Sequence, residues 1–276
     1  MEKLEKAFPL PSVNPSSTAL TFISALLEEF ADEWGNKWMM HFRWYSARSA
    51  PDYAAYTRKI AVEMNSGQAP GTAGLAEAVN TTASFFQERM LGRGFTVGSN
   101  EVTAPVIEAS FIDFIILLDA HLGADRPFIM GSSPCMADFG LSGQLYQMLT
   151  DTTAGEMMRL HAPNVALWAE RMLNPCAVLG GEFEEWDSLA STLEPILSNQ
   201  VSMFLAWSAA NAKALAAGDK ELSMQLPDGR PWKQIIGGPQ KYHGKSLAEI
   251  RRKFGLVAGD KQLTDILANC GCLSVL

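Results

Sequence analysis

The chain has 276 residues, a net charge of −8, and 47% hydrophobic against 19% charged residues. This composition excludes a disordered chain, because there are enough apolar side chains to build a large core. It also argues against nucleic-acid binding, since no cluster of Lys and Arg is available to neutralise phosphates.

The first elements in chain order are a short charged segment and a proline-rich linker, which occupy residues 1–16. Met1 to Lys6 has no apolar core, so no signal peptide is predicted. Pro9, Pro11 and Pro15 are too closely spaced for a helix to continue through them. Ser16 or Ser17 can cap the helix that follows.

The clearest pattern is a long helix from about Thr18 to about Ala47. Apolar and aromatic residues recur there at steps of three and four: Leu20, Ile23, Leu26, Leu27, Phe30, Trp34, Trp38, His41, Phe42 and Tyr45. Much of the opposite side of this predicted helix is polar, with Asp32, Glu33, Asn36, Lys37 and Arg43.

Further helices are predicted up to about residue 216. They cover about 52–64, 75–91, 105–122, 135–149, 154–158, 163–173 and 182–216. Residues 221–232 alternate and turn at Asp228-Gly229, which predicts a β-hairpin. Two short helices, at about 246–254 and 261–269, follow it. The fold class predicted is all-α, a helical bundle with a small C-terminal β-hairpin and a helical extension.

The chemistry available for metals, disulfides and membranes is sparse. Four cysteines are too few for a disulfide scaffold, and four scattered histidines do not form a metal-binding pattern. The uncharged stretch 195–212 contains several polar residues, so a buried helix is expected there and not a membrane span. We therefore expect a cytoplasmic protein that binds no metal, membrane or nucleic acid.

Residues 127–145, which read PFIMGSSPCMADFGLSGQL, carry a motif together with Pro163 and Trp168. The motif resembles the helical C-terminal domain of glutathione transferases, in which Pro-Ser-x-Ala-Asp-Phe precedes a buried helix and a later Pro-x-x-x-x-Trp. The resemblance covers about residues 17–175, and Met130-Gly131 takes the place of the family's Leu-Gly pair. Residues 30–34 with Lys37, 41–44 and 97–101 look like one branch of glutathione-transferase-like proteins.

The resemblance implies a glutathione-transferase C-terminal-like helical bundle and a division of the chain into three parts. These are a remnant of a preceding domain with its linker (1–16), the helical domain (17–216) and a C-terminal extension (217–276). In the family, a thioredoxin-like domain binds glutathione and activates its thiol. No βαβ pattern of such a domain is present, so glutathione stays a possible cofactor that this chain alone does not support, and conventional conjugation is not expected.

Two motif residues are assigned structural roles at the start of the helix at 135–149. Asp138 is expected to accept hydrogen bonds from free backbone N–H groups in the first turn. Cys135 stands where the family has Ser or Thr at the N-cap. Because a thiol is a weak acceptor, we expect the cap to be weaker, by about 0.5–1 kcal/mol.

The candidate substrate-binding residues are Trp34, Trp38, His41, Phe42 and Tyr45, on one stripe of the first long helix. They are expected either to line a pocket for an apolar small molecule or to pack in the core. His41 is the titratable group of this stripe and could act as a general base or orient a carbonyl. Arg43 and Arg48 could bind an anion or form salt bridges. No catalytic residue is identified.

Three functions follow from these observations. The first is a glutathione-transferase-like protein that binds an apolar small molecule, with transferase chemistry left open. The second is a non-catalytic assembly module that uses the first long helix as its surface, as a homodimer or with a separate protein. The third is a transferase whose glutathione site comes from a separate thioredoxin-like chain.

Overall fold

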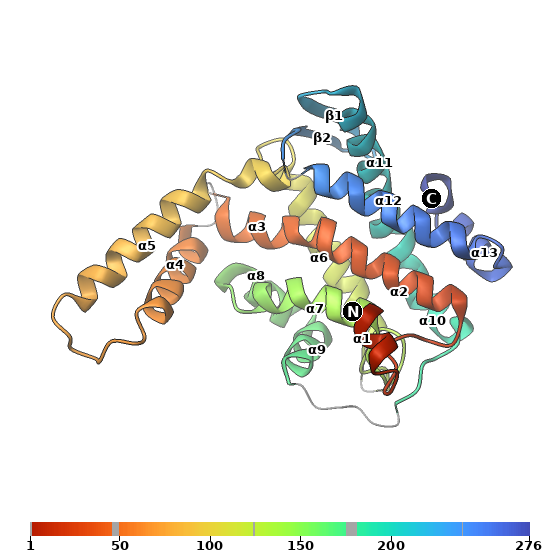
Figure 1. The fold of residues 1–276 in the computed structure, drawn as a ribbon, viewed down its shortest axis with the longest axis horizontal. Helices are drawn as coiled ribbons and strands as arrows, with labels where there is room; N and C mark the ends of the chain where they lie inside the picture. The colour runs from red at the N-terminus through yellow and green to blue at the C-terminus, as the bar shows by residue number, and fades with distance from the viewer. Residues whose placement is uncertain (1, 46–49, 124, 175–180, 239) are drawn as a thin grey trace.

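The computed structural model describes residues 2–45, 50–123, 125–174, 181–238 and 240–276. Helices make up most of this part of the chain, and its sheet consists of two antiparallel strands. Figure 1 shows the helices gathered into one body, from which two helices project as an arm. The predicted helical fold with a small C-terminal β-hairpin is confirmed.

The first long helix is a rod of three joined segments. After α1 (Glu2–Ala7) and the linker, α2 (Thr18–Phe30) begins with the Ser17 hydroxyl accepting a hydrogen bond from the Leu20 N–H. A π-turn, η1 (Ala31–Gly35), joins α2 to α3 (Asn36–Trp44). The prediction is confirmed over 18–44 apart from the π-turn, and residues 46–47 lie outside the described residues.

The arm consists of α4 (Ala50–Met64) and α5 (Leu75–Leu91). Both helices lie close to the ranges predicted from the sequence. The chain then returns to the body through a short 3₁₀ helix, η2 (Gly94–Val97).

Four helices carry the chain through the middle of the body. They are α6 (Ala104–His121), α7 (Met136–Leu149), α8 (Thr152–His161) and α9 (Pro163–Leu173). Proline stands in the first turn of α6 and of α9, where its missing N–H costs no helical hydrogen bond. α6 and α7 lie against the first rod, and α9 packs on α7.

A second rod and the C-terminal elements close the body. The rod consists of α10 (Trp186–Ile196), a second π-turn η3 (Leu197–Val201) and α11 (Ser202–Ala217). The hairpin β1 (Glu221–Gln225) and β2 (Pro231–Ile235) follows, with Met224 opposite Trp232. The last elements are α12 (Gln240–Val257), α13 (Lys261–Asn269) and the 3₁₀ turn η4 (Leu273–Val275).

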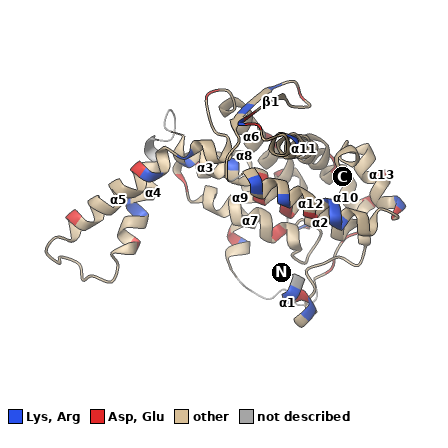
Figure 2. Ribbon diagram, turned by 45° about the horizontal axis from the view of Figure 1, so that its top comes forward, with Lys and Arg blue, Asp and Glu red and all other residues tan. Residues whose placement is uncertain are grey.

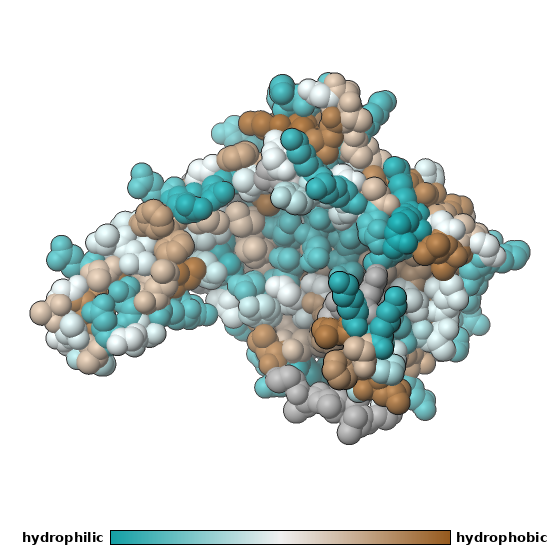
Figure 3. Space-filling model, in the orientation of Figure 1, coloured by the Kyte–Doolittle hydropathy of each residue, from teal (hydrophilic) through white to brown (hydrophobic). Residues whose placement is uncertain are grey.

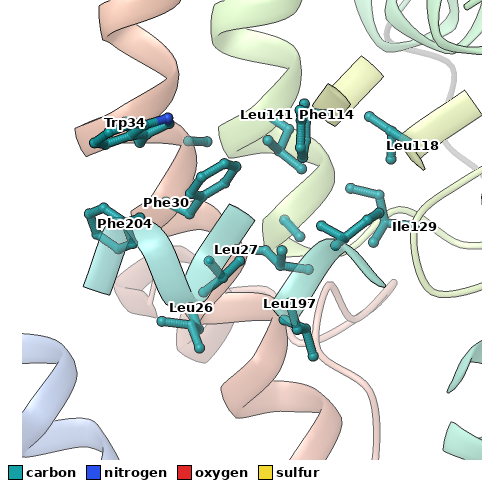
Figure 4. Packing of buried hydrophobic residues seen from close by; sticks show 14 of the residues in the cluster. Leu26, Leu27, Phe30, Trp34, Phe114, Leu118, Ile129, Leu141, Leu197 and Phe204 are labelled. Atoms are coloured by element: carbon teal, nitrogen blue, oxygen red, sulfur yellow. The ribbon is translucent and has the colours of Figure 1, made fainter. Parts of the chain in front are cut away.

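The core lies between the two rods and α6 and α7 (Figure 4). Leu26, Leu27 and Phe30 of the first rod are fully buried. They meet Phe114 and Leu118 of α6, Leu141 of α7, and Leu197 and Phe204 of the second rod. Burying one such side chain contributes about 1.5–3 kcal/mol, so the contact between the rods stabilises the body strongly. The aromatic stripe of the first helix is thus covered by the chain itself.

Gly131 fixes the motif loop against a distant segment. It has a φ of +131°, and a Cβ added there would lie 2.6 Å from the Glu182 carbonyl oxygen. The Ser132 N–H donates to that carbonyl at 2.9 Å, and the Glu184 N–H donates to the Met130 carbonyl at 2.8 Å. A side chain cannot be accommodated at this position, which explains the glycine.

Asp138 joins the two halves of the motif. Its buried carboxylate accepts hydrogen bonds from the N–H groups of Ile129 (3.0 Å) and Cys135 (2.9 Å) and from Trp168 Nε1 (2.8 Å). The hydroxyl of Ser24 on α2 accepts from the Ala137 N–H at 3.0 Å. Ser24 therefore supplies a cap to the first turn of α7, where the sequence offers only the Cys135 thiol. Burial raises the pKa of that thiol well above its usual range, which disfavours a reactive thiolate.

Candidate functional site

A cleft of about 600 Å³ opens between α3, α6 and α8, with the start of α4 at its edge. It is larger than the space of a few water molecules and falls in the size range of small-molecule sites. Its lining residues come from four segments that lie far apart in the sequence: His41, Phe42, Asp52, Pro105, Glu108, Ala109, Ile112, Asp113, Thr153 and Met157.

Apolar side chains line much of the cleft. Phe42 contributes an aromatic ring from α3, and Pro105, Ala109 and Ile112 form a ridge along α6. Met157 faces them from α8, and its flexible thioether adapts to irregular shapes. Phe42 itself is held in place by Phe111, whose ring centroid lies 5.0 Å from its own.

A hydrogen-bonded series of three residues, Ser99, His41 and Glu108, lies at the cleft, with His41 in the middle. The His41 Nδ1 lies 2.8 Å from the Ser99 hydroxyl, and its Nε2 lies 3.2 Å from Glu108 Oε1. An ionised carboxylate only accepts, so in neutral His41 the proton is on Nε2 and Nδ1 accepts from Ser99. Both nitrogens of this buried ring are therefore engaged, and His41 and Glu108 both border the cleft.

Two further carboxylates stand at the cleft. Asp52 on α4 is buried and accepts from the Thr153 N–H at 2.8 Å and from the Thr153 hydroxyl at 2.7 Å. This contact fixes the base of the arm to the first turn of α8. Asp113 is exposed on α6. Among the cleft residues that the structure describes, none is Lys or Arg, and the surroundings are acidic.

The five predicted substrate-binding residues separate into two groups. His41 and Phe42 line the cleft, and the Tyr45 ring stacks on His41 at 4.8 Å with an interplanar angle of 20°. Trp34 and Trp38 are 0% exposed and lie in the core. Their indole N–H groups share one acceptor, the Ser110 hydroxyl, at 3.3 and 2.7 Å. These two residues support the wall behind the cleft and do not line it.

Lys37 occupies a site that the sequence did not predict. It was expected on the polar side of the first helix, but its side chain is 1% exposed. Its Nζ lies 3.8 Å from the Trp207 ring centroid and 5.7 Å from those of Trp34 and Trp232. It also donates to the Val97 carbonyl at 3.3 Å.

Burial and the indole faces act on the Lys37 ammonium in opposite directions. Burial lowers the pKa of Lys37 to about 7, while the electron-rich ring faces favour the charged form. The Trp207 and Trp232 indoles are in turn held by Gln234 Oε1, which accepts from both at 3.2 and 2.8 Å. This closed arrangement ties the first rod to the hairpin and leaves the amine out of contact with solvent.

Arg43 is also buried and forms an ion pair. Its Nε donates to both carboxylate oxygens of Asp151, at 3.1 and 2.9 Å, and its guanidinium lies 3.7 Å from the Tyr56 ring centroid. Burial raises the pKa of Asp151 to about 6, although Arg43 acts in the opposite direction. Of the two expected uses of Arg43, the structure shows the salt bridge, and Arg48 lies outside the described residues.

Sequence reasoning missed Glu108, Asp52 and Met157. A signal was present for Glu108, because Glu108 and Asp113 are the charged residues in the otherwise apolar run 104–118. A carboxylate within such a run needs a polar partner or a solvent-lined cavity. Asp52 lies on α4 and Met157 on α8, and no sequence pattern indicates that these helices pack beside α3.

The described ranges hold no group of three or more His, Cys, Asp and Glu side chains arranged to bind a metal ion. They also contain no helix with the length and apolarity needed to cross a membrane. Comparisons of the chain with protein-family models, curated proteins and solved structures found no match.

Proposed function

We propose that the protein is glutathione-transferase-like and binds an apolar small molecule in the cleft between α3, α6 and α8. The observation that carries this proposal is the cleft of about 600 Å³, whose lining is largely apolar and includes the Glu108 carboxylate. Such a combination favours a ligand with a hydrophobic body and few polar groups.

The likeness to the helical domain of glutathione transferases is part of the proposal. It is supported by the contact between the two motif segments, in which Trp168 donates a hydrogen bond to Asp138. It is also supported by the buried position of Asp138 in the first turn of α7. In that family the helical domain supplies most of the site for the apolar second substrate, which agrees with a cleft built from helices alone.

Glutathione fits the described cleft poorly. Glutathione carries two carboxylates, and the described residues around the cleft include Asp52, Glu108 and Asp113. Like charges at short distance disfavour binding unless a cation intervenes. We therefore place the apolar compound in this cleft and assign no glutathione site to it.

His41 acts by positioning Glu108. Its ring is buried with both nitrogens engaged, so a ligand in the cleft meets the Glu108 carboxylate first. A ligand that offers an O–H or N–H group near Glu108 gains a charge-assisted hydrogen bond. Any proton removed from a ligand in the cleft would pass to this carboxylate.

The experiment is a titration of the full chain with N-phenyl-1-naphthylamine, a neutral dye that fluoresces more strongly in apolar surroundings. We expect saturable binding of one dye per chain. Ala109→Trp places an indole in the cleft and should weaken dye binding at least about tenfold, which corresponds to 1.4 kcal/mol.

Ala120→Trp is the matched control. Ala120 lies on the same helix, α6, but is exposed and lies outside the cleft. This variant should bind the dye as the wild type does. Equal dye binding by the wild type and Ala109→Trp, or no binding by the wild type, would contradict the proposal.

The alternative function, a non-catalytic assembly module, is favoured by a different part of the molecule. The surface first expected for it, the aromatic stripe of the first helix, is buried. The α4–α5 arm instead exposes large apolar side chains. This second function does not compete for the cleft, so the two can be tested separately.

A further inference from the structure

Exposed apolar side chains are scattered over the molecule and mark no particular surface. They occur on helices, strands and loops alike, and Figure 3 shows hydrophobic side chains in small separate groups on one face. Single exposed apolar residues are normal for a protein surface. Buried polar groups without a partner are rarer and more informative, because leaving such a group unpaired costs free energy.

Gln200 carries such a group. It lies in the π-turn η3 beside the buried Leu197 and Val201, and it is 2% exposed. Its Oε1 is enclosed and has no hydrogen-bond partner among the described residues. An apolar residue would fill this position without the cost of burying an amide. The amide therefore indicates a polar partner that the described part of the chain does not supply, and π-turns frequently occur at functional sites.

A cavity of about 370 Å³ adjoins this amide. Asn199 and Gln200 line it from η3, Asp113 from α6, and Asp228 and Arg230 from the turn of the hairpin. It is separate from the cleft between α3, α6 and α8, although Asp113 borders both. One water molecule occupies only about 30 Å³ in the liquid, so this cavity has room for a small organic molecule.

The described lining of this cavity is acidic. The Arg230 Nε donates to the Asp228 carboxylate at 2.6 Å, so the charges of this pair offset each other. Asp113 then gives the lining a net negative charge. The basic side chains of the C-terminal region gather on α12 (Figure 2), which contributes no residue to the described lining.

We propose that this cavity binds a small aliphatic ammonium compound. An ammonium group offers three donors and no acceptor, which matches the Asp113 carboxylate and the unpartnered Gln200 Oε1. A hydrogen bond between an ammonium and a carboxylate is about twice as strong as a neutral one. Ile116 and Leu117 line the cavity from α6 and pack against the alkyl chain. These apolar neighbours favour an organic cation over Mg²⁺ or Ca²⁺, which take oxygen ligands on all sides.

Isothermal titration calorimetry of the full chain with n-butylamine hydrochloride tests this proposal. We expect saturable binding of one butylammonium ion per chain at pH 7. The neutral analogue 1-butanol should bind at least about tenfold more weakly, which corresponds to 1.4 kcal/mol, and butyrate should not bind. Gln200→Met keeps a side chain of similar length but removes the amide, and it should weaken butylammonium binding at least about tenfold.

Asp113→Asn and Asp187→Asn form a matched pair of charge variants, because both aspartates are exposed. Asp113 lines the cavity, so its replacement should weaken butylammonium binding at least about tenfold. Asp187 lies on α10, outside the described lining, so its replacement should have no effect. Ala109→Trp, which fills the other cleft, should also leave butylammonium binding unchanged. The result is therefore independent of the dye titration.

Circular dichroism checks that the variants are folded, and we expect the wild-type spectrum for Gln200→Met and Asp113→Asn. A wild-type chain that shows no saturable binding of butylammonium would overturn the proposal. Equal affinities for butylammonium and 1-butanol would do the same, because the cavity would then not recognise the charge. Unchanged binding by Gln200→Met or Asp113→Asn would place the ligand elsewhere and would also contradict the proposal.

Discussion

The body and the α4–α5 arm differ in how completely their side chains are enclosed. The body buries charged side chains: Lys37 within three indoles, Arg43 against Asp151, and Asp138 beneath three N–H donors. The arm is thinner: Val79 is the buried residue among the described residues of α5, and Val62 and Phe85 are at least half exposed. The buried charges of the body depart from the usual rule that charged residues lie outside, whereas single exposed apolar residues occur in both regions.

Each buried charge in the body has partners within hydrogen-bond or ring contact, so its role is complete within the chain. In the arm, Val62 and Phe85 remain at least half exposed, although the Phe85 ring lies 5.6 Å from that of Phe86. The body therefore depends on tightly packed side chains, and the arm depends on them less.

The strongest test of this comparison replaces one buried and one exposed aromatic residue. Trp38→Ala removes a side chain that packs against Phe30, Phe111 and Phe114. We expect the free energy of unfolding to fall by about 3–5 kcal/mol, because the cavity cannot refill. Phe85→Ala, measured at a concentration where the chain is monomeric, should change it by less than about 1 kcal/mol.

Urea unfolding followed by circular dichroism measures both values. Comparable losses from the two substitutions would show that the arm carries a core of its own. The distinction between a self-contained body and an uncovered arm would then be lost.

A smaller effect concerns the buried Lys37 and its dependence on pH. The folded chain releases the Lys37 proton at a pKa of about 7, while an unfolded lysine holds it to about 10.4. Between these values the unfolded state binds more protons, so the free energy of unfolding rises with pH, by at most about 1.4 kcal/mol per unit. The variant Lys37→Met lacks this pH dependence. The difference by which its free energy of unfolding exceeds that of the wild type should therefore shrink from pH 7 to pH 10.

Lys59→Met is the control for this prediction, since Lys59 is an exposed lysine on the arm. Its unfolding free energy should follow the wild-type curve at every pH. Parallel curves for wild type and Lys37→Met would show that the indole rings keep the ammonium charged throughout this range.

The helices were predictable from the sequence, whereas the burial of Lys37 was not. Steps of three and four residues indicate a helix over 18–44, and the proline at 105 indicates where α6 begins. The neighbouring Trp38, which the same pattern assigned to the apolar stripe, is fully buried, and Lys37 is enclosed as well because Trp207 of α11 and Trp232 of β2 pack around it. No local pattern connects Lys37 with these distant residues.

The cleft was only partly predictable. His41 and Phe42 belong to a visible stripe, but Ser99 and Glu108 are 58 and 67 residues away from His41. No local spacing connects such residues, because the packing of α3 against α6 brings them together. The arm was predictable in a different respect. Its helices and the uncharged residues 78–87 can be read from the sequence, but only the fold shows that α5 projects away from the body.

Hydrogen exchange of the full chain, with and without N-phenyl-1-naphthylamine, tests the central claim most directly because it locates the ligand. We predict that the dye slows amide exchange in residues 104–113 of α6 and 152–157 of α8, the segments that form the cleft. Protection confined to the C-terminal residues 221–276, or no protection at all at saturating dye, would contradict a small-molecule site between α3, α6 and α8.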